Sequence, residues 1–428
     1  MTDKLNQYPT SAQDKMNFIT RMTADQQLRV VVFFSGRLDE TLMARAVRIA
    51  MDCEPVLGCR FVEQPNRTYW ERRSDLDELE LCRVVEGNPA GMMAFLTEPT
   101  DPCREPLLKA RIFRNPEGDT LCLKVDHAAA DGTGSKEAAY LVADTYTHLL
   151  ADPDYRPGLG KFNRRSQSAF FRQAGLKNLI KYRPRSLSLP HQNRFTLPYN
   201  ENRNDGQSYA VRILTPGEVR SLKAYGKTHG ATLNDLILAA FFRALSKACN
   251  ATPGKAYSIQ VPIDLRHSLP EGKEQRICNL SGGLFPAVTL QAGETFEETL
   301  ASVKSTMAHW KSNQPGLTGA MIMELAFALG YAKGKAQVQR IASAHGKDVS
   351  PLLLSNLGVL DANRLDFGLL KIESAYELGP IMLNNGLMLT ASTYADHLTL
   401  GMGYCRGNLA AEIVEGLVEA VKCELDLF

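Results

Sequence analysis

A histidine and an aspartate at the junction of a strand and a helix are the residues of this 428-residue chain that are best suited to chemistry. The segment LCLKVDHAAADGTGSKEAAYL predicts a strand that ends at Asp126-His127 and a helix that begins after Asp131-Gly132. Imidazole has an ordinary pKa near ~6.5, so it can accept a proton from a nucleophile and return it near neutral pH. We therefore predict that His127 is a general base in a loop, where catalytic groups often lie.

Each residue of this motif also has a structural explanation. A lone histidine at a strand end is more often a satisfied polar residue than a catalyst, and Asp131 before Gly132 is typical of a turn. Asp126 either orients the loop or faces solvent at the end of its strand. The alanines at 128–130 are small enough to leave space beside the imidazole, and Gly132 permits backbone angles that other residues resist. Taken alone, HxxxDG is a weak pattern in a chain of this length.

Composition and missing motifs exclude several classes of protein. Apolar residues make up 44% of the chain, charged residues 22%, and the net charge is +2; these are globular values that give no reason to expect a nucleic-acid partner. The cysteines include no CxxC pair, so we expect reduced thiols. No P-loop, GxSxG, GxGxxG or HExxH motif is present, and we expect no metal. With neither a signal-peptide pattern nor a ~20-residue apolar run, we expect a cytoplasmic protein.

The predicted elements alternate irregularly along the chain. Strands are predicted at 29–36, 109–115, 119–126, 208–215, 256–266, 282–290 and 397–407. Helices are predicted at 39–54, 133–150, 216–230, 231–248, 295–311, 317–332 and 409–428. Thr232 and Asp235 form a capping-box-like pair at the start of one of these helices. The mixed order and the hairpin around 115–118 favour α+β layers over a doubly wound parallel sheet.

A change of composition divides the chain into two halves. Between residues 161 and 200 there are nine Lys or Arg and no Asp or Glu. We interpret 152–205 as a crossover between an N-terminal half, 1–151, which carries HxxxDG, and a C-terminal half, 206–428. The basic stretch 161–194 is either a solvated loop or a surface that docks an acidic carrier protein, the phosphates of CoA or an anionic membrane.

In this context the chain resembles the CoA-dependent acyltransferase superfamily, which includes chloramphenicol acetyltransferase, alcohol acetyltransferases and the condensation domains of nonribosomal peptide synthetases. YPTSAQDKMNFI is similar to the opening motif of condensation domains, and ATLNDLILAAFFRAL to a helix of the family. VPIDLR, ICNLSG and LSNLG follow in the family's order, and DFG is similar to a motif of the plant enzymes, although Leu369 replaces its Trp. The resemblance implies two chloramphenicol acetyltransferase-like subdomains, each a mixed sheet flanked by helices, with an active-site tunnel between them.

The resemblance also implies a reaction and roles for residues. An acyl group would pass from acyl-CoA, or from a phosphopantetheine thioester on an acyl or peptidyl carrier protein, directly to a hydroxyl acceptor, with no bound cofactor and no acyl-enzyme. Asp131 would be structural and would pair with an arginine of the other half. The candidate is Arg266, which could equally be an exposed strand-end residue. The candidates for an oxyanion or tunnel residue, each also explained by turn chemistry, are Asn279, Ser355 and Asn356.

One departure from the family keeps two alternatives open. Many members carry two adjacent histidines, and here the first of them is Asp126. This change weakens the case for a peptide-bond-forming condensation domain in particular. The alternatives are a free-standing condensation enzyme with an amine acceptor and a non-catalytic carrier-docking protein of the same fold. The intact HxxxDG motif argues against the second alternative.

Overall fold

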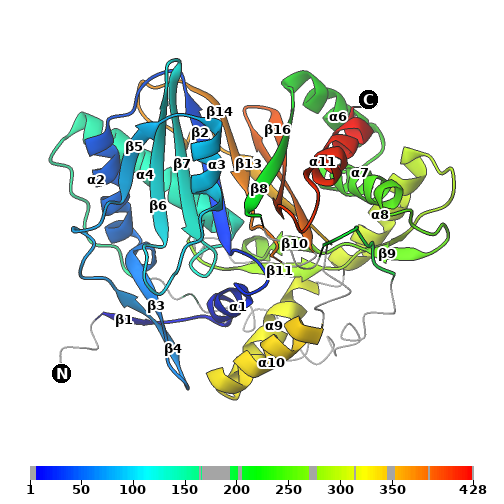
Figure 1. The fold of residues 1–428 in the computed structure, drawn as a ribbon, viewed down its shortest axis with the longest axis horizontal. Coiled ribbons are helices and arrows are strands. Elements are labelled where there is room, and N and C mark those ends of the chain that lie inside the picture. The colour runs from blue at the N-terminus through cyan, green and yellow to red at the C-terminus, as the bar shows by residue number, and fades with distance from the viewer. Residues whose placement is uncertain are drawn as a thin grey trace.

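The computed structural model describes residues 6–162, 165, 193–200, 205–268, 277–312, 315–344, 352–383 and 386–426. Two mixed sheets with helices packed against them make up the two subdomains, which lie on the left and right of Figure 1. This is the α+β architecture predicted from the sequence. Within the described residues, no helix combines the length and the apolar character needed to cross a membrane.

The N-terminal subdomain is built on a five-stranded sheet. In sheet order its strands are β14 (Ile372–Leu378), β2 (Gln27–Phe34), β7 (Gly118–Asp126), β6 (Leu108–Asn115) and β5 (Cys82–Glu86). β7 is buried along its whole length because helices cover both faces of the sheet. One face packs on α2 (Glu40–Cys53) and α4 (Gly132–Ala151), and the other on α3 (Pro89–Thr97). The strand that ends at Asp126, just before His127, is therefore held firmly on both sides.

The C-terminal subdomain is built on a four-stranded sheet. In sheet order its strands are β13 (Leu352–Leu360), β15 (Leu387–Tyr394), β16 (His397–Cys405) and β8 (Gln207–Leu214). Its helices are α6 (Pro216–Thr228), α7 (Leu233–Ala248), α8 (Phe296–Ser312) and α11 (Ala411–Leu425). The capping box predicted for α7 is present, with the Thr232 hydroxyl accepting from the Asp235 amide and the Asp235 carboxylate accepting from the Thr232 amide.

β14 joins the two subdomains in a way that no sequence pattern predicted. It follows β13 in the chain, yet it pairs antiparallel with β2 at the edge of the N-terminal sheet. The Gly379 carbonyl, just after β14, also accepts hydrogen bonds from both subdomains. The donors are the Arg29 guanidinium of β2 at 3.2 Å and the Tyr209 hydroxyl of β8 at 2.7 Å. The two halves of the sequence are thus interleaved at this strand.

Short elements complete the fold around the two sheets. They are β1 (Gln7–Pro9), α1 (Ala12–Thr20), η1 (Pro55–Gly58), β3 (Cys59–Glu63), β4 (Thr68–Arg72), β9 (Ala256–Ser258), β10 (Val261–Asp264), η2 (Arg266–Ser268), β11 (Ser281–Leu284), β12 (Ala287–Thr289), α9 (Pro315–Ala328) and α10 (Tyr331–Ala344). α1 packs on α9 and α10 at the bottom of Figure 1. α1 therefore links the start of the chain to the C-terminal half.

Most of the predicted crossover, 152–205, lies outside the described residues. The same holds for most of the basic stretch 161–194, so its predicted docking and membrane contacts stay predictions. One residue of the stretch is placed deep inside the molecule: the Arg165 side chain is buried. This arginine is accounted for by an internal ion pair and belongs neither to a solvated loop nor to a docking surface.

Candidate active site

The loop between β7 and α4 is shaped by its own polar residues. We call residues 126–132 the His127 loop. The His127 amide donates to the Gln26 carbonyl at 2.8 Å, which holds the loop against the start of β2. The Ala128 amide donates to Asp126 Oδ1 at 2.8 Å and closes the first turn. Asp131 caps α4, because its Oδ1 accepts from the Gly134 amide at 2.9 Å. The predicted strand–loop–helix unit is therefore present.

Asp126 orients the loop from inside the protein. Its side chain is buried, so the alternative of a solvent-facing strand end is wrong. Burial raises the pKa of Asp126 to about 7, because a carboxylate away from water is disfavoured. A charge that changes near neutral pH thus lies next to His127 in the chain.

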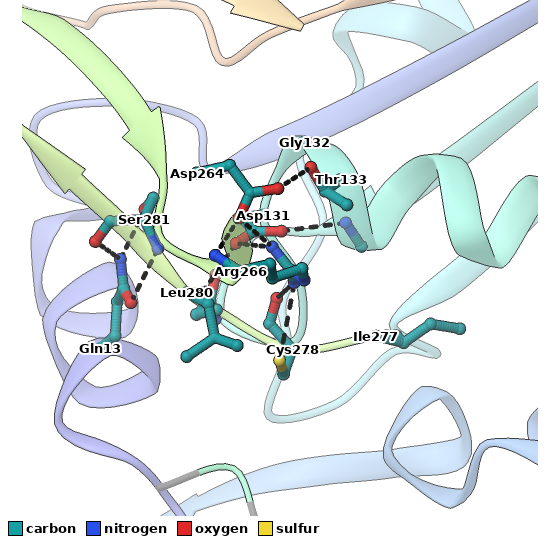
Figure 2. Close-up of polar contacts among 12 residues, drawn as sticks. Gln13, Asp131, Gly132, Thr133, Asp264, Arg266, Ile277, Cys278, Leu280 and Ser281 are labelled. Atoms are coloured by element: carbon teal, nitrogen blue, oxygen red, sulfur yellow. Dashed lines mark hydrogen bonds and ion pairs between the residues drawn. The ribbon is translucent and has the colours of Figure 1, made fainter. Parts of the chain in front are cut away.

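Asp131 and Arg266 form the ion pair predicted from the sequence, and Figure 2 shows it between α4 and the β10–β11 hairpin. Arg266 Nη1 lies 2.9 Å from Asp131 Oδ2, and the same oxygen accepts from the Leu280 amide at 2.7 Å. Arg266 Nη2 donates to the Cys278 carbonyl at 2.9 Å. Both side chains are largely buried, so the alternative of an exposed Arg266 is wrong. Burial would lower the pKa of Arg266, but the charge and hydrogen bond of Asp131, with smaller contributions from Cys278 and Asp264, together outweigh this and raise it.

Gly132 is required for close packing and not for an unusual backbone angle. It is the first residue of α4 and is absent from the glycines with positive φ, which corrects our expectation. A Cβ atom at this position would come within 2.6 Å of Leu357 Cδ2 on β13. Gly132 therefore lets β13 of the C-terminal sheet approach the start of α4.

The three alanines of the loop pack in the core instead of leaving space beside the imidazole. Ala128, Ala129 and Ala130 are each at most 1% exposed and belong to the N-terminal hydrophobic core. Their carbonyl groups are used as well. The Ala128 carbonyl accepts from Asn279, and the Ala129 carbonyl accepts from Arg165. The small side chains thus allow polar groups to reach the loop backbone.

A second buried ion pair, between Asp14 and Arg165, also holds the His127 loop and was missed by sequence reasoning. Arg165 Nε donates to Asp14 Oδ2 at 2.8 Å and Arg165 Nη2 to Asp14 Oδ1 at 2.9 Å. Arg165 Nη1 also donates to the Ile277 carbonyl at 2.9 Å, and the Trp70 indole donates to Asp14 Oδ2 at 3.0 Å. Burial would raise the pKa of Asp14, but the charge of Arg165 and the hydrogen bonds from Arg165, Trp70 and Asn279 together outweigh it and lower that pKa. The sequence placed Asp14 only within the opening motif; in the structure it is the N3 residue of the capping box that begins at Ser11.

The three predicted oxyanion candidates lie in different surroundings. Asn279 is fully buried, and its Nδ2 donates to Asp14 and Ala128, so both amide hydrogens are taken and it cannot serve as the oxyanion donor in this arrangement. Asn356 is exposed, and its Oδ1 accepts from the Gly358 amide at 3.0 Å, which is the turn alternative. Ser355 is half-buried on β13, and its hydroxyl has no hydrogen-bond partner in the described part of the chain.

His127 itself is half-buried and contacts Asn17 of α1. Asn17 Nδ2 lies 3.0 Å from His127 Nδ1, 2.8 Å from the His127 carbonyl oxygen and 3.1 Å from Asn279 Oδ1. Asn17 lies in the segment 8–19 that carried the resemblance, but nothing in that segment singled it out. The catalytic candidate is therefore held by a helix from the other end of the N-terminal half.

Sequence reasoning also missed Glu377, a buried acid near the start of α4. Glu377 on β14 contacts the Ser135 hydroxyl, and that hydroxyl lies 3.0 Å from the Gly132 carbonyl. One hydroxyl hydrogen cannot serve both acceptors, but a protonated Glu377 can donate to Ser135, which then donates to Gly132. Glu377 Oε2 has no hydrogen-bond partner among the described residues. Burial raises the pKa of Glu377 to about 8. The hydrogen-bond pattern and the raised pKa therefore both indicate that Glu377 is a neutral acid near pH 7.

Comparison with known proteins agrees with this geometry. The model of the condensation-domain family matches residues 5–315. Two uncharacterized proteins from two strains of Mycobacterium tuberculosis are 24% identical over 270 residues, which are 60% of this chain; the match spans only 61% of their own length. Among solved structures, polyketide synthase associated protein 5 from Mycobacterium tuberculosis gives a TM-score of 0.70 at 17% identity, covering 98% of both chains. TRI3 trichothecene 15-O-acetyltransferase from Fusarium sporotrichioides gives 0.74 at 12% identity, covering 98% of this chain and 94% of that one.

The Asp131–Arg266 pair should behave as one unit in a double-mutant cycle. We expect Arg266→Ala to lower the free energy of unfolding by ~3–5 kcal/mol, because it leaves Asp131 buried without its cation. Asp131→Asn should also destabilise the protein, and the double variant should lose less than the sum, since the two residues serve one interaction. Urea unfolding measures this. The exposed pair Lys223 and Asp396 is the matched control, and its coupling should be much weaker because both side chains are solvated. Additive losses at Asp131 and Arg266 would contradict the coupling.

Glu377→Gln should change how stability depends on pH. Glutamine keeps the shape and donor of the neutral acid. In the wild type the native state holds a proton that the unfolded chain loses above its pKa of 4.5, so wild-type stability falls as pH rises toward about 8. The variant should lack this fall and should be more stable at pH 8, relative to low pH, by on the order of a few kcal/mol. Denaturant unfolding across this pH range measures it. Glu373→Gln, at an exposed position of β14, is the control; identical pH profiles for wild type and Glu377→Gln would refute the neutral acid.

Proposed function

The chain belongs to the condensation-domain family, and from this premise we propose that it transfers an acyl group from a thioester to a hydroxyl acceptor, with His127 as the general base. The observation that carries the proposal is the intact His127 loop at the meeting of the two subdomains, with Asp131 bound to Arg266 across them. A loop that only joined a strand to a helix would need no such fixed connection to the opposite subdomain. The donor is acyl-CoA or an acyl thioester on a carrier protein.

The proposed reaction is a single displacement without an acyl-enzyme. His127 takes the proton of the acceptor hydroxyl as its oxygen bonds to the thioester carbon, and a tetrahedral intermediate forms. The carbon–sulfur bond then breaks, and the imidazolium returns the proton to the leaving thiolate. A hydroxyl needs this help because its pKa lies far above neutral pH, and positioned proton transfer typically contributes ~10²–10⁴-fold. Holding both substrates in the predicted tunnel would contribute through proximity.

The proposed oxyanion donor is the Ser355 hydroxyl, the remaining candidate of the three. It lies on β13, two residues before Leu357, and the Lys136 ammonium of α4 contacts the Leu357 carbonyl. Leu357 also packs against Gly132, so this part of β13 adjoins the His127 loop. A hydroxyl without a partner can donate to a developing oxyanion without first giving up another bond.

A hydroxyl acceptor is favoured over an amine on two grounds. The residue before His127 is Asp126, where many condensation domains carry a first histidine. One solved structure of the same fold is, by its name, an O-acetyltransferase. The amine alternative is supported by the family model, and several neighbours are condensation domains. Carrier docking without catalysis is the third alternative, because one neighbour is described as associated with a polyketide synthase.

The test is thiol release from acyl-CoA and from an acyl-pantetheine thioester, with a panel of alcohols and amines as acceptors. We expect His127→Ala to lower the rate by ~10²–10⁴-fold, the range of general-base catalysis. His148→Ala, at a half-exposed position of α4, is the matched control and should leave the rate unchanged. Mass spectrometry of the product identifies an ester or an amide. Equal rates for wild type and His127→Ala with every donor and acceptor would leave carrier docking as the function.

A further inference from the structure

The hydrogen bonds of Asn17 carry an inference about the protonation of His127. Asn17 Nδ2 faces the His127 carbonyl oxygen, Asn279 Oδ1 and His127 Nδ1, all within 3.1 Å. An amide nitrogen carries two hydrogens and no acceptor, whereas a neutral imidazole has one donor and one acceptor nitrogen. Which end of the Asn17 amide faces the ring therefore decides which ring nitrogen can carry the proton.

The direction of this network is set at Asp14. Arg165 keeps Asp14 ionised by lowering its pKa against the effect of burial, so its oxygens only accept. Asn279 lies 3.1 Å from Asp14 Oδ1 and 2.8 Å from the Ala128 carbonyl oxygen, which also only accepts. The nitrogen of the Asn279 amide must therefore point to these two oxygens. Its Oδ1 is then left facing Asn17.

The same reasoning fixes Asn17. Asn279 Oδ1 and the His127 carbonyl oxygen are both acceptors without a hydrogen. If the Asn17 amide were turned over, its oxygen would lie against both of them, at 3.1 Å and 2.8 Å, in a half-buried place where such repulsion is only partly screened. Asn17 Nδ2 must therefore face them, and it consequently faces His127 Nδ1 at 3.0 Å.

We infer that Asn17 is a positioning residue that keeps the proton of neutral His127 on Nε2. A hydrogen on Nδ1 would point at an amide nitrogen that only donates, whereas a bare Nδ1 can share one of the two amide hydrogens with a neighbouring oxygen. The inference rests on the proposed function for its consequence. In the resting enzyme Nε2, the ring nitrogen that does not face Asn17, carries a hydrogen and is a donor. Base catalysis through Nε2 draws on the tautomer that Asn17 disfavours, so the side chain at position 17 controls how much base is present.

The inference is tested by ¹⁵N NMR of protein labelled at histidine nitrogen, above pH ~8, where imidazole is neutral. Subtracting the His127→Ala spectrum assigns the signals. We expect the wild type to show a bare Nδ1 and a protonated Nε2. Asn17→Asp, which offers Nδ1 an acceptor, should reverse this pattern, and Asn17→Ala should give signals averaged between the tautomers. Asn363→Ala, at an exposed position, should leave the wild-type pattern unchanged.

Two results would overturn the inference: a protonated Nδ1 in the wild type, or the same tautomer in wild type, Asn17→Ala and Asn17→Asp. If Asn17→Asp does not fold, the comparison of wild type with Asn17→Ala still decides it. Thiol release with hydroxyl acceptors gives a separate readout, and we expect Asn17→Asp to be severalfold faster than Asn17→Ala. Absence of thiol release in all proteins would end the proposed function, while the NMR result would still decide the tautomer.

Discussion

The carboxylate of Asp131 is shared by three parts of the molecule, and the position of His127 depends on it. One oxygen caps α4, and the other receives both Arg266 and the Leu280 amide of the C-terminal half. A capping contact alone would hold only the helix, and a surface ion pair would add little. Because the pair is buried, removing Arg266 from the closed structure would leave the charge of Asp131 without water or a partner. The loop is therefore positioned by the contact between subdomains.

The charge of each buried acid around the loop depends on whether an arginine lies beside it. Two buried carboxylates, Asp14 and Asp131, each have an arginine, whereas the buried acids Asp126 and Glu377 have raised pKa values because burial is not offset by a cation. Paired acids can only accept hydrogen bonds, and a neutral acid can donate one. The pattern of charged and neutral acids consequently sets the direction of the hydrogen bonds that reach the loop. In this way Asp14 sets which groups donate and which accept at Asn279, at Asn17 and finally at the imidazole.

The proposed acyl transfer requires rigidity at the histidine and access for two substrates. The family membership accounts for the fold, and the described contacts account for the rigidity. Close approach of β13 at Gly132 and the insertion of β14 beside β2 make the two subdomains one structural unit around the loop. Under the proposed function, substrate choice would depend on side chains that line the predicted tunnel between the subdomains.

The sequence by itself determined the strand, the loop and the capped helix around His127, because hydrophobic periodicity and helix caps depend on residues a few positions apart. It also indicated the partner of Asp131 through resemblance. Only the tertiary structure decided the contacts of Asn17 with His127 and of Asp14 with Arg165, which join residues 110 and 151 positions apart. The burial of Asp126 and the role of Glu377 likewise depend on which strand lies beside β2. Local spacing carries no information about such pairings, because sheet order and packing between distant segments create them.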